Sequence, residues 1–378
     1  MRLLAASLAA LISVVLPAAA QSRDAEVQLA FARAQHLRHG INASEWFAQA
    51  GDYSAARTNR YTAAADIALM AHLGFDNVRL SIDAAPLTQY PLGKDGLNDE
   101  FVGRLDRAVD AMLANGLAVQ IDLHPQDNYK QQLRTGDYPV DQLVLLWSKL
   151  AAHYAGRDPE RIFFEVLNEP EVNDAYRWAG IQERVAAAIR QAAPRNTIIA
   201  TGANYSDIPD LLALQPLADG NVIYNFHFYE PHQFTHQGAT WGLTWWRYTH
   251  NIPYPATDAE MQEKLAQVPD PVNRYQLEEY FLDHWDARRI RLMIDEAAAW
   301  GRDHHVPLIS NEFGVYRNFS DPIARATWIH DVRTAFEADG IGWAMWDYRG
   351  GFGVVTKQDG QPAQVDGAIV GALGLTEK

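Results

Sequence analysis

Eight short stretches rich in β-branched and aromatic residues recur along this chain of 378 residues. They cover 37–43, 75–83, 117–124, 161–170, 196–205, 221–230, 306–314 and 340–348. Amphipathic helical patterns separate most of them. The pattern over 98–116, for example, repeats apolar residues at helical spacing and ends at Gly116. Eight strands that alternate with helices predict an α/β fold, a (β/α)8 or TIM barrel.

A doubly wound open sheet is the alternative architecture. Such a sheet usually has fewer strands, and it often carries a glycine-rich phosphate loop after the first strand. The sequence contains neither a GxGxxG nor a GxxxxGK[ST] pattern. The barrel is therefore the preferred prediction.

The first twenty residues have the pattern of an export signal. Arg2 precedes an apolar stretch, and Ala18 and Ala20 form a small-residue cleavage pattern. A membrane anchor is the alternative, but the apolar stretch is short for a span and no basic flank follows it. We expect a signal peptide over 1–20, a single catalytic domain over 21–378, and a secreted or periplasmic location without a membrane contact after cleavage.

Composition excludes several classes of partner and site. The formal net charge of −15 disfavours nucleic acid and anionic lipid, and it suits a neutral substrate. The chain contains no cysteine, so disulfides, a catalytic thiol and thiolate metal sites are excluded. We expect a monomer without a cofactor.

Polar side chains stand at the ends of the predicted strands, where a barrel places its catalytic mouth. The apolar run at the start of FFEVLNEPEV, residues 163–172, is followed by a carboxylate, Glu169. A second carboxylate, Glu312, stands near the end of the seventh stretch. The fold would bring the two together across one pocket. Paired carboxylates in different surroundings are what glycoside cleavage requires.

These strand ends resemble those of glycoside hydrolase family 5, the family of cellulases and related β-glycanases. FFEVLNEP is similar to the central motif of that family, and RHGINASEWF, VRL, DLH, NFHFY, SNEFG and WAMWDY follow its order. The resemblance implies a retaining double displacement, with Glu169 as general acid/base and Glu312 as nucleophile. It also implies substrate-site roles for Arg79, His124, Asn168, His227, Tyr229 and Trp346.

The resemblance gives these neighbours specific tasks. Arg79 and Tyr229 would lie beside Glu312 and stabilise its charge, and Asn168 would bind the sugar 2-hydroxyl. His124 and His227 would line the same subsite, with Trp346 as its floor, joined to Asp347 by a cis peptide bond.

Two expectations concern the protonation of the acid/base. A carboxylate without a nearby cation and close to a second negative charge should have a raised pKa, so we expect this of Glu169. Glu171 departs from the family pattern. It would either raise the proton affinity of Glu169 or point into solvent.

The connection between Tyr229 and Val306 is far longer than one barrel helix requires. Its first part contains Trp241, Trp245 and Trp246 amid Gly, His and Pro. These indoles could be core residues or sugar-stacking platforms. We expect at least one of them to face the cleft, and the substrate-binding candidates are Trp241 and Trp245. The segment could also close one end of the cleft and favour an exo mode.

Other polar residues have simpler readings. Glu165 shares the strand face of Glu169 and is predicted to be a buried structural carboxylate. Six histidines could suggest a metal, but they lack the HxH and HExxH spacings of metal sites, so we expect none. They are His36, His39, His232, His236, His304 and His305.

The leading hypothesis is a secreted endo-β-1,4-glucanase acting on a β-glucan or a related oligo- or polysaccharide. The alternatives are a β-mannanase, an exo-acting β-glucanase or β-glucosidase, a metal-dependent barrel hydrolase, and a non-catalytic carbohydrate-binding protein.

Overall fold

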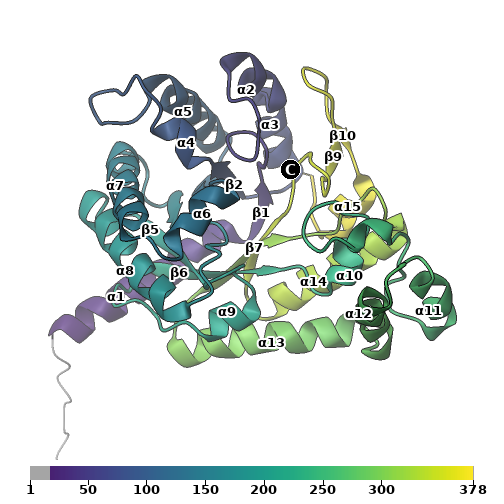
Figure 1. Ribbon diagram of the computed structural model, residues 1–378. Coiled ribbons are helices and arrows are strands. Elements are labelled where there is room, and N and C mark those ends of the chain that lie inside the picture. The colour runs from purple at the N-terminus through teal and green to yellow at the C-terminus, as the bar shows by residue number, and fades with distance from the viewer. Residues whose placement is uncertain (1–17, 378) are drawn as a thin grey trace, which may run out of the picture.

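The computed structural model describes residues 18–377, with side chains from residue 22 onward (Figure 1). The predicted signal peptide lies outside these residues, apart from its last three positions. Within the described part of the chain, no helix combines the length and the apolar character that crossing a membrane requires.

Eight parallel strands form a closed barrel in sequence order, as predicted, and β1 closes the ring by pairing with β8. The strands are β1 (His39–Asn42), β2 (Asn77–Ile82), β3 (Ala118–Leu123), β4 (Ile162–Glu165), β5 (Thr197–Thr201), β6 (Val222–Phe228), β7 (Leu308–Phe313) and β8 (Gly342–Met345). Every one of them falls inside a stretch identified from the sequence. Because all eight are parallel, their carboxyl ends meet at one mouth.

Helices surround the barrel and pack their apolar faces against it (Figure 1). The longer outer helices are α3 (Ala64–His72), α5 (Asp99–Ala114), α7 (Asp137–Tyr154), α8 (Ala175–Ala192), α13 (Ala287–His304) and α14 (Pro322–Ala338). Shorter elements are α2 (Ala55–Tyr61), α4 (Ala84–Leu87), α6 (Asp127–Leu133), α9 (Ile208–Leu212), α15 (Gly367–Ala372) and the two-stranded sheet of β9 (Val355–Thr356) and β10 (Gln364–Val365).

Local sequence signals account for the helix ends. The side chain of Asn98 accepts a hydrogen bond from the backbone N–H of Phe101 and so caps α5. Gly116 follows that helix with a φ of 80°, a conformation that glycine adopts without steric cost. Two helices, α12 (Pro271–Leu282) and α13, follow one another closely before β7. Asp286 caps the second helix, and this cap fixes the break.

The N-terminal helix α1 (Ala18–Ala34) and η1 (Gln35–Leu37) cover the end of the barrel opposite the mouth (Figure 1). Ala30, Ala34 and Leu37 form a buried cluster with strand residues such as Phe163 and Ile199. This end of the barrel is therefore closed by apolar packing, and the polar strand ends are left to the other face.

The long connection between β6 and β7 holds α10 (His232–Thr235), η2 (Trp246–Tyr248), α11 (Asp258–Leu265) and α12 before α13 begins. In Figure 1 the green α11 and α12 stand beside the barrel at its lower right. The first part of the connection, from α10 to η2, follows directly from the carboxyl end of β6. It is therefore placed at the rim of the mouth.

Candidate active site

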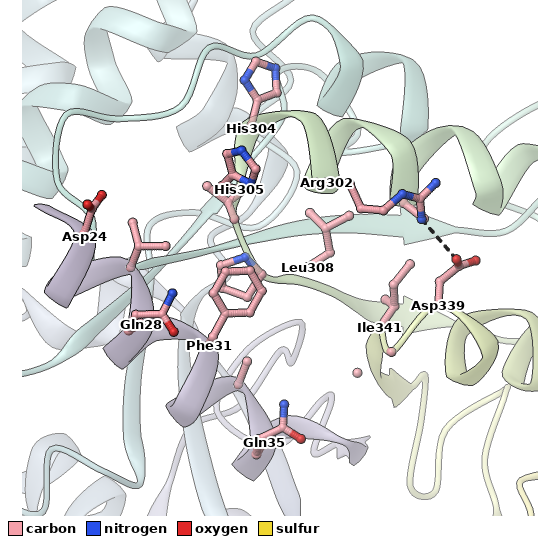
Figure 2. Close-up of a pocket in the computed structure, with 18 of the residues that line it drawn as sticks. Asp24, Gln28, Phe31, Gln35, Arg302, His304, His305, Leu308, Asp339 and Ile341 are labelled. Carbon is pink, nitrogen blue, oxygen red and sulfur yellow. Dashed lines mark hydrogen bonds and ion pairs between the residues drawn. The ribbon is translucent and has the colours of Figure 1, made fainter. Parts of the chain in front are cut away.

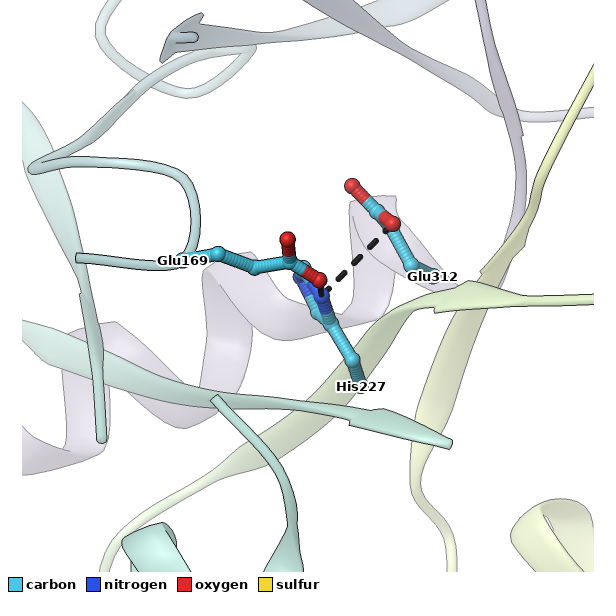
Figure 3. Close-up of side chains that lie close together, drawn as sticks. All are labelled: Glu169, His227 and Glu312. Atoms are coloured by element: carbon cyan, nitrogen blue, oxygen red, sulfur yellow. Dashed lines mark hydrogen bonds and ion pairs between the residues drawn. The ribbon is translucent and has the colours of Figure 1, made fainter. Parts of the chain in front are cut away.

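Two carboxylates and one imidazole meet at the carboxyl ends of β4, β6 and β7 (Figure 3). Glu169 follows β4, His227 lies on β6 and Glu312 lies on β7. One potential ligand atom from each of the three lies within 4.8 Å of the other two. The barrel thus brings together the two carboxylates that the sequence separates widely.

Arg79 is the central buried charge beneath this site, with no solvent exposure. Its Nε and Nη2 each donate to one oxygen of Glu165 at 2.7 Å, and its Nη1 pairs with Glu312. Asp122 lies 3.1 Å away. Burial lowers the pKa of Arg79, but the three carboxylates raise it by more than burial lowers it. The pKa of Arg79 is therefore well above its ordinary value.

Glu165 has the structural role expected from the sequence. It is fully buried, and besides Arg79 it accepts a hydrogen bond from Asn311 at 2.7 Å. Burial raises the pKa of Glu165, while Arg79 opposes that change. The side chain balances charge inside the barrel, and both of its oxygens are occupied by Arg79.

Glu312 has a donor on each of its oxygens. Arg79 holds Oε1, and the hydroxyl of Tyr229 donates to Oε2 at 3.0 Å. The carboxylate is buried, so water does not compete for these contacts. The two donors hold the carboxylate in one orientation and stabilise negative charge on its oxygens.

Glu169 has a cationic neighbourhood, which corrects the expectation from the sequence. His227 Nδ1 lies 3.0 Å from Glu169 Oε1 and 3.6 Å from Glu312 Oε2. Burial raises the pKa of Glu169, but the hydrogen bond and charge of His227, together with Lys130, lower it to about 2. Burial lowers the pKa of His227, and the two carboxylates raise it above its ordinary value. The opposite directions of the two shifts favour a proton on His227 over one on Glu169.

Asn168 and His124 form a neutral polar pair beside these charges. Arg79 Nη2 donates to Asn168 Oδ1 at 2.9 Å, and Asn168 Nδ2 lies 3.1 Å from His124 Nε2. His124 Nδ1 lies 2.9 Å from Asp122. Burial lowers the pKa of His124 to about 3, so the ring is neutral and accepts from Asn168.

Trp346 follows β8 and is partly exposed. Its ring stacks with that of His124 at a centroid distance of 5.7 Å. The peptide bond between Trp346 and Asp347 is cis, as the resemblance implied. The indole therefore borders the polar groups of the mouth.

Glu171 does not point into solvent, which excludes one of its two alternatives. Only 8% of the residue is exposed, and its Oε1 lies 2.7 Å from the Nζ of Lys130. Its Oε2 lies 3.2 Å from Arg134. These two ion pairs could not be predicted from the sequence, because neither Lys130 nor Arg134 stands at a strand end.

The three tryptophans of the long connection have different surroundings. Trp245 is only 3% exposed and donates its indole N–H to Gln276 at 2.7 Å, so its predicted contact with substrate is contradicted by its burial. Trp246 is buried and stacks on His232. Trp241 is 47% exposed.

Trp241 is connected to Tyr229 by aromatic contacts. Its ring lies edge-on to Tyr316 at 4.9 Å and 6.4 Å from Phe352, which in turn lies 6.0 Å from Tyr229. An exposed indole near the mouth remains a candidate sugar platform.

A cavity of about 780 Å³ lies at the opposite end of the barrel (Figure 2). It is lined by α1, the end of α13 and the starts of β7 and β8, including Phe31, His304 and His305. Arg302 and Asp339 form an ion pair at its edge, at 3.2 Å. The strand ends with the paired glutamates are on the other face, so this cavity is not the candidate active site.

Comparison with known proteins identifies the family. Residues 41–351 match the family described as "Cellulase (glycosyl hydrolase family 5)". Endoglucanase 3 of Fibrobacter succinogenes is 28% identical over 343 residues, which are 85% of this chain and 51% of that protein. Endoglucanase C of Acetivibrio thermocellus is 27% identical over 319 residues, 83% of this chain and 91% of that one. The chain thus spans about half the length of the first relative and most of the second.

A shorter match has higher identity. Cellodextrinase A of Ruminococcus flavefaciens is 35% identical over 215 residues, 53% of this chain and 61% of that protein. Among solved structures, Cel5A of Thermotoga maritima in complex with cellobiose has a TM-score of 0.74 at 24% identity, covering 91% of this chain and 98% of that one. The same protein in complex with mannotriose gives a TM-score of 0.69. The family match extends over most of the barrel, and so the chain belongs to glycosyl hydrolase family 5 and is a glycosidase.

Proposed function

We propose that this protein is a retaining endo-β-1,4-glucanase in which Glu169 is the general acid/base and Glu312 the nucleophile. The observation that carries this proposal is the close approach of the two carboxylates, with one oxygen of each within 4.8 Å. Retaining glycosidases keep their carboxyl groups about 5–5.5 Å apart, and inverting enzymes leave about 6.5–9.5 Å for a water molecule. The short separation supports direct attack by a carboxylate.

The first step forms a covalent glycosyl-enzyme. Glu312 attacks the anomeric carbon, the bond from that carbon to the leaving oxygen breaks, and the leaving oxygen takes a proton from Glu169. In the free protein we assign that proton to His227, whose Nδ1 lies 3.0 Å from Glu169 Oε1. We propose that it crosses this hydrogen bond when substrate binds, because the leaving oxygen then needs an acid at Glu169.

The second step reverses the roles. With Glu312 esterified, one negative charge near Glu169 is gone, and Glu169 acts as a base that takes a proton from water. The water oxygen bonds to the anomeric carbon and Glu312 leaves as a carboxylate. Arg79 and Tyr229 already donate to its two oxygens, so they stabilise the charge that returns.

The neighbouring groups are placed to hold the reacting sugar. Asn168 is fixed by Arg79 and His124, and we assign it to the 2-hydroxyl, where hydrogen bonds strengthen in the transition state. Trp346 offers an indole face that packs on the apolar face of a pyranose ring.

The names of the relatives support a β-1,4-glucan as substrate, since two of them are endoglucanases. Cellodextrinase A supports a preference for shorter chains as the second candidate, and Trp241 at the rim of the mouth is compatible with either. The Cel5A complexes with cellobiose and mannotriose leave a mannan substrate as an outcome to test. Chromatography of products from β-glucan, mannan, xylan and cello-oligosaccharides distinguishes these substrates.

We further propose that the protein is exported to the periplasm or the medium, and that it acts as a single domain and as a monomer. The N-terminal pattern and the acidic composition support this proposal. N-terminal sequencing of the mature protein would test the cleavage near Ala20.

The catalytic assignment is tested by replacing Glu169 with alanine. Turnover of cello-oligosaccharides should fall by about 10²- to 10⁴-fold, while aryl glycosides with acidic leaving groups should lose far less, because they need no proton in the first step. Added azide should restore turnover of the aryl substrate and give a β-glycosyl azide. The exposed Glu183, on α8, provides a control when replaced by alanine. Equal losses on both substrates without azide rescue would remove Glu169 from this role.

A metal-dependent hydrolase is the remaining rival, because Glu169, His227 and Glu312 are also the group whose geometry could hold an ion among the described residues. The guanidinium of Arg79 and the hydroxyl of Tyr229 already engage Glu312. We expect full activity after EDTA treatment and dialysis. A loss that a divalent ion reverses would support the rival.

A further inference from the structure

A buried cation lies next to the segment that carries Glu169. Lys130, on α6, is only 4% exposed, and its Nζ lies 2.7 Å from Glu171 Oε1. Its contact with the exposed Asp127 is much longer, at 4.0 Å. An ammonium group out of water needs a close counter-charge, so Glu171 is the partner that allows Lys130 to be buried.

Glu171 connects three parts of the barrel mouth. Its Oε2 and its carbonyl oxygen accept hydrogen bonds from Arg134, just after α6, at 3.2 and 2.6 Å. Its backbone N–H donates to the carbonyl of Asn204, which follows β5, at 2.7 Å. The segment after β4 is thereby tied to the connections that follow β3 and β5.

The segment needs such contacts because of its backbone conformation. Glu169 has a φ of 36° and Glu171 a φ of 54°, both in the left-handed region that favours glycine. Residues with a Cβ occupy this region at a cost and stay there when surrounding contacts require it. The ion pair and the two hydrogen bonds from Arg134 supply such contacts two residues away from the acid/base.

Lys130 also contributes charge to the site. Several charged and titratable groups face Glu169. They are His227 and Tyr229 from β6 and its end, Glu312 from β7, His124 from the end of β3, His232 from α10, His236 just after α10, and Lys130 from α6. Burial lowers the pKa of Lys130, and Glu169 and Glu171 more than offset this, so the amine stays charged. The charge of Lys130 also lowers the pKa values of Asp122 and His124.

We propose that Lys130 and Glu171 are a pair of positioning residues for Glu169: their ion pair fixes the segment that carries this carboxylate, and the balance of their two charges sets its proton affinity. The pair does not touch the reacting atoms. Its positioning role rests on the proposed function, in which Glu169 is the acid/base. Lys130 opposes protonation of Glu169 and Glu171 offsets that influence.

The test compares two single variants whose effects should have opposite signs. The alkaline limb of kcat/KM reports the loss of the proton that the Glu169–His227 pair must hold for acid catalysis. Lys130→Met removes a cation and leaves an anion, so the limb should move to higher pH. Glu171→Gln removes the anion and leaves the cation, so the limb should move to lower pH. Charges at this range should move the limb by about 0.5–1.5 pH units in each case.

Three further variants make the outcome specific. Lys130→Arg keeps the charge and should leave the limb near that of the parent. Lys130→Met/Glu171→Gln removes both charges and should return the limb toward the parent value. Lys264→Met on α11 removes another buried cation that is paired with glutamates, and it should lower the melting temperature without moving the limb.

Lower melting temperatures with an unmoved limb in both single variants would overturn the proposal and leave a purely structural pair. Shifts of the same sign would overturn it too. If Lys130→Met does not fold, Glu171→Gln decides alone, because its amide keeps the size of the side chain. NMR titration of ¹³C-labelled glutamate side chains reads the same shift of Glu169 without activity. If the parent protein cleaves no β-glycoside, the proposed function is refuted, and the NMR titration still tests the Lys130–Glu171 pair.

Discussion

Replacing Glu165 by glutamine tests the buried charge balance beneath the active site. Glu165 accepts three hydrogen bonds of 2.7 Å, two from Arg79 and one from Asn311. An amide has one acceptor oxygen. If that oxygen takes the position of Oε2, the Nε and Asn311 contacts survive, and the new NH₂ group faces Arg79 Nη2. The variant therefore loses one charge-assisted hydrogen bond and gains a buried donor without a partner.

The magnitude follows from these losses. A hydrogen bond to a charged group contributes about 1.5–3 kcal/mol, and a buried unpaired donor costs about 1–3 kcal/mol. Neutralising a carboxylate that is unfavourably buried recovers part of this, because burial already raises the pKa of Glu165. Since Arg79 Nη2 also keeps its contact with Asn168, we expect a net loss of about 2–4 kcal/mol in the free energy of unfolding.

The assay is urea unfolding at pH 7 with kcat/KM measured in parallel. Activity should fall by about tenfold, because Arg79 also positions Asn168 and Glu312 and a small displacement reduces the rate. Glu183→Gln, an exposed change on α8, should stay within about 0.5 kcal/mol of the parent. A loss below about 1 kcal/mol for Glu165→Gln with unchanged activity would refute the view that Glu165 balances the charge of Arg79.

Three more predictions concern individual contacts of the site. Tyr229→Phe removes the 3.0 Å donor to Glu312 and should lower kcat by about 10- to 100-fold with little change in melting temperature; an unchanged kcat would contradict this role. Trp241→Ala should raise KM for long oligosaccharides by about 5- to 30-fold, whereas Trp245→Ala should mainly lower the melting temperature, because Trp245 is core; the reverse pattern would exchange their roles. The pKa of His227 is raised above 6.5, so the proton shared with Glu169 is present below the pKa of His227 and lost above it. The alkaline limb of kcat/KM should therefore lie above pH 6.5, and a limb near pH 5 would exclude the shared proton.

Much of the fold follows from local sequence. The β-rich stretches and the helical patterns between them predicted all eight strands and their order, because the two periodicities reflect which face of each element is buried. The same stretches predicted which polar side chains stand at the mouth. Glu312 is one example, because its position near the carboxyl end of a parallel strand places it at the mouth once the barrel closes.

Contacts between separate connections could not be predicted in this way. Trp241 and Trp245 lie four positions apart in one aromatic segment, yet one is exposed at the rim and the other is buried against Gln276. The break between α12 and α13 is a further example, because it depends on a single capping residue, Asp286. Burial of a loop side chain depends on what packs over it, which local periodicity does not record.

The sequence by itself determined the barrel, the presence of two glutamates at its strand ends and the family of enzymes to which the chain belongs. Only the tertiary structure decided the electrostatics of that pair. It placed His227 between Glu169 and Glu312 and brought Lys130 to Glu171, so Glu169 has cationic neighbours, contrary to the expectation from the sequence. The physical reason is that strand ends are set by short stretches of chain, whereas the charge around a buried carboxylate is the sum over every element that packs against it.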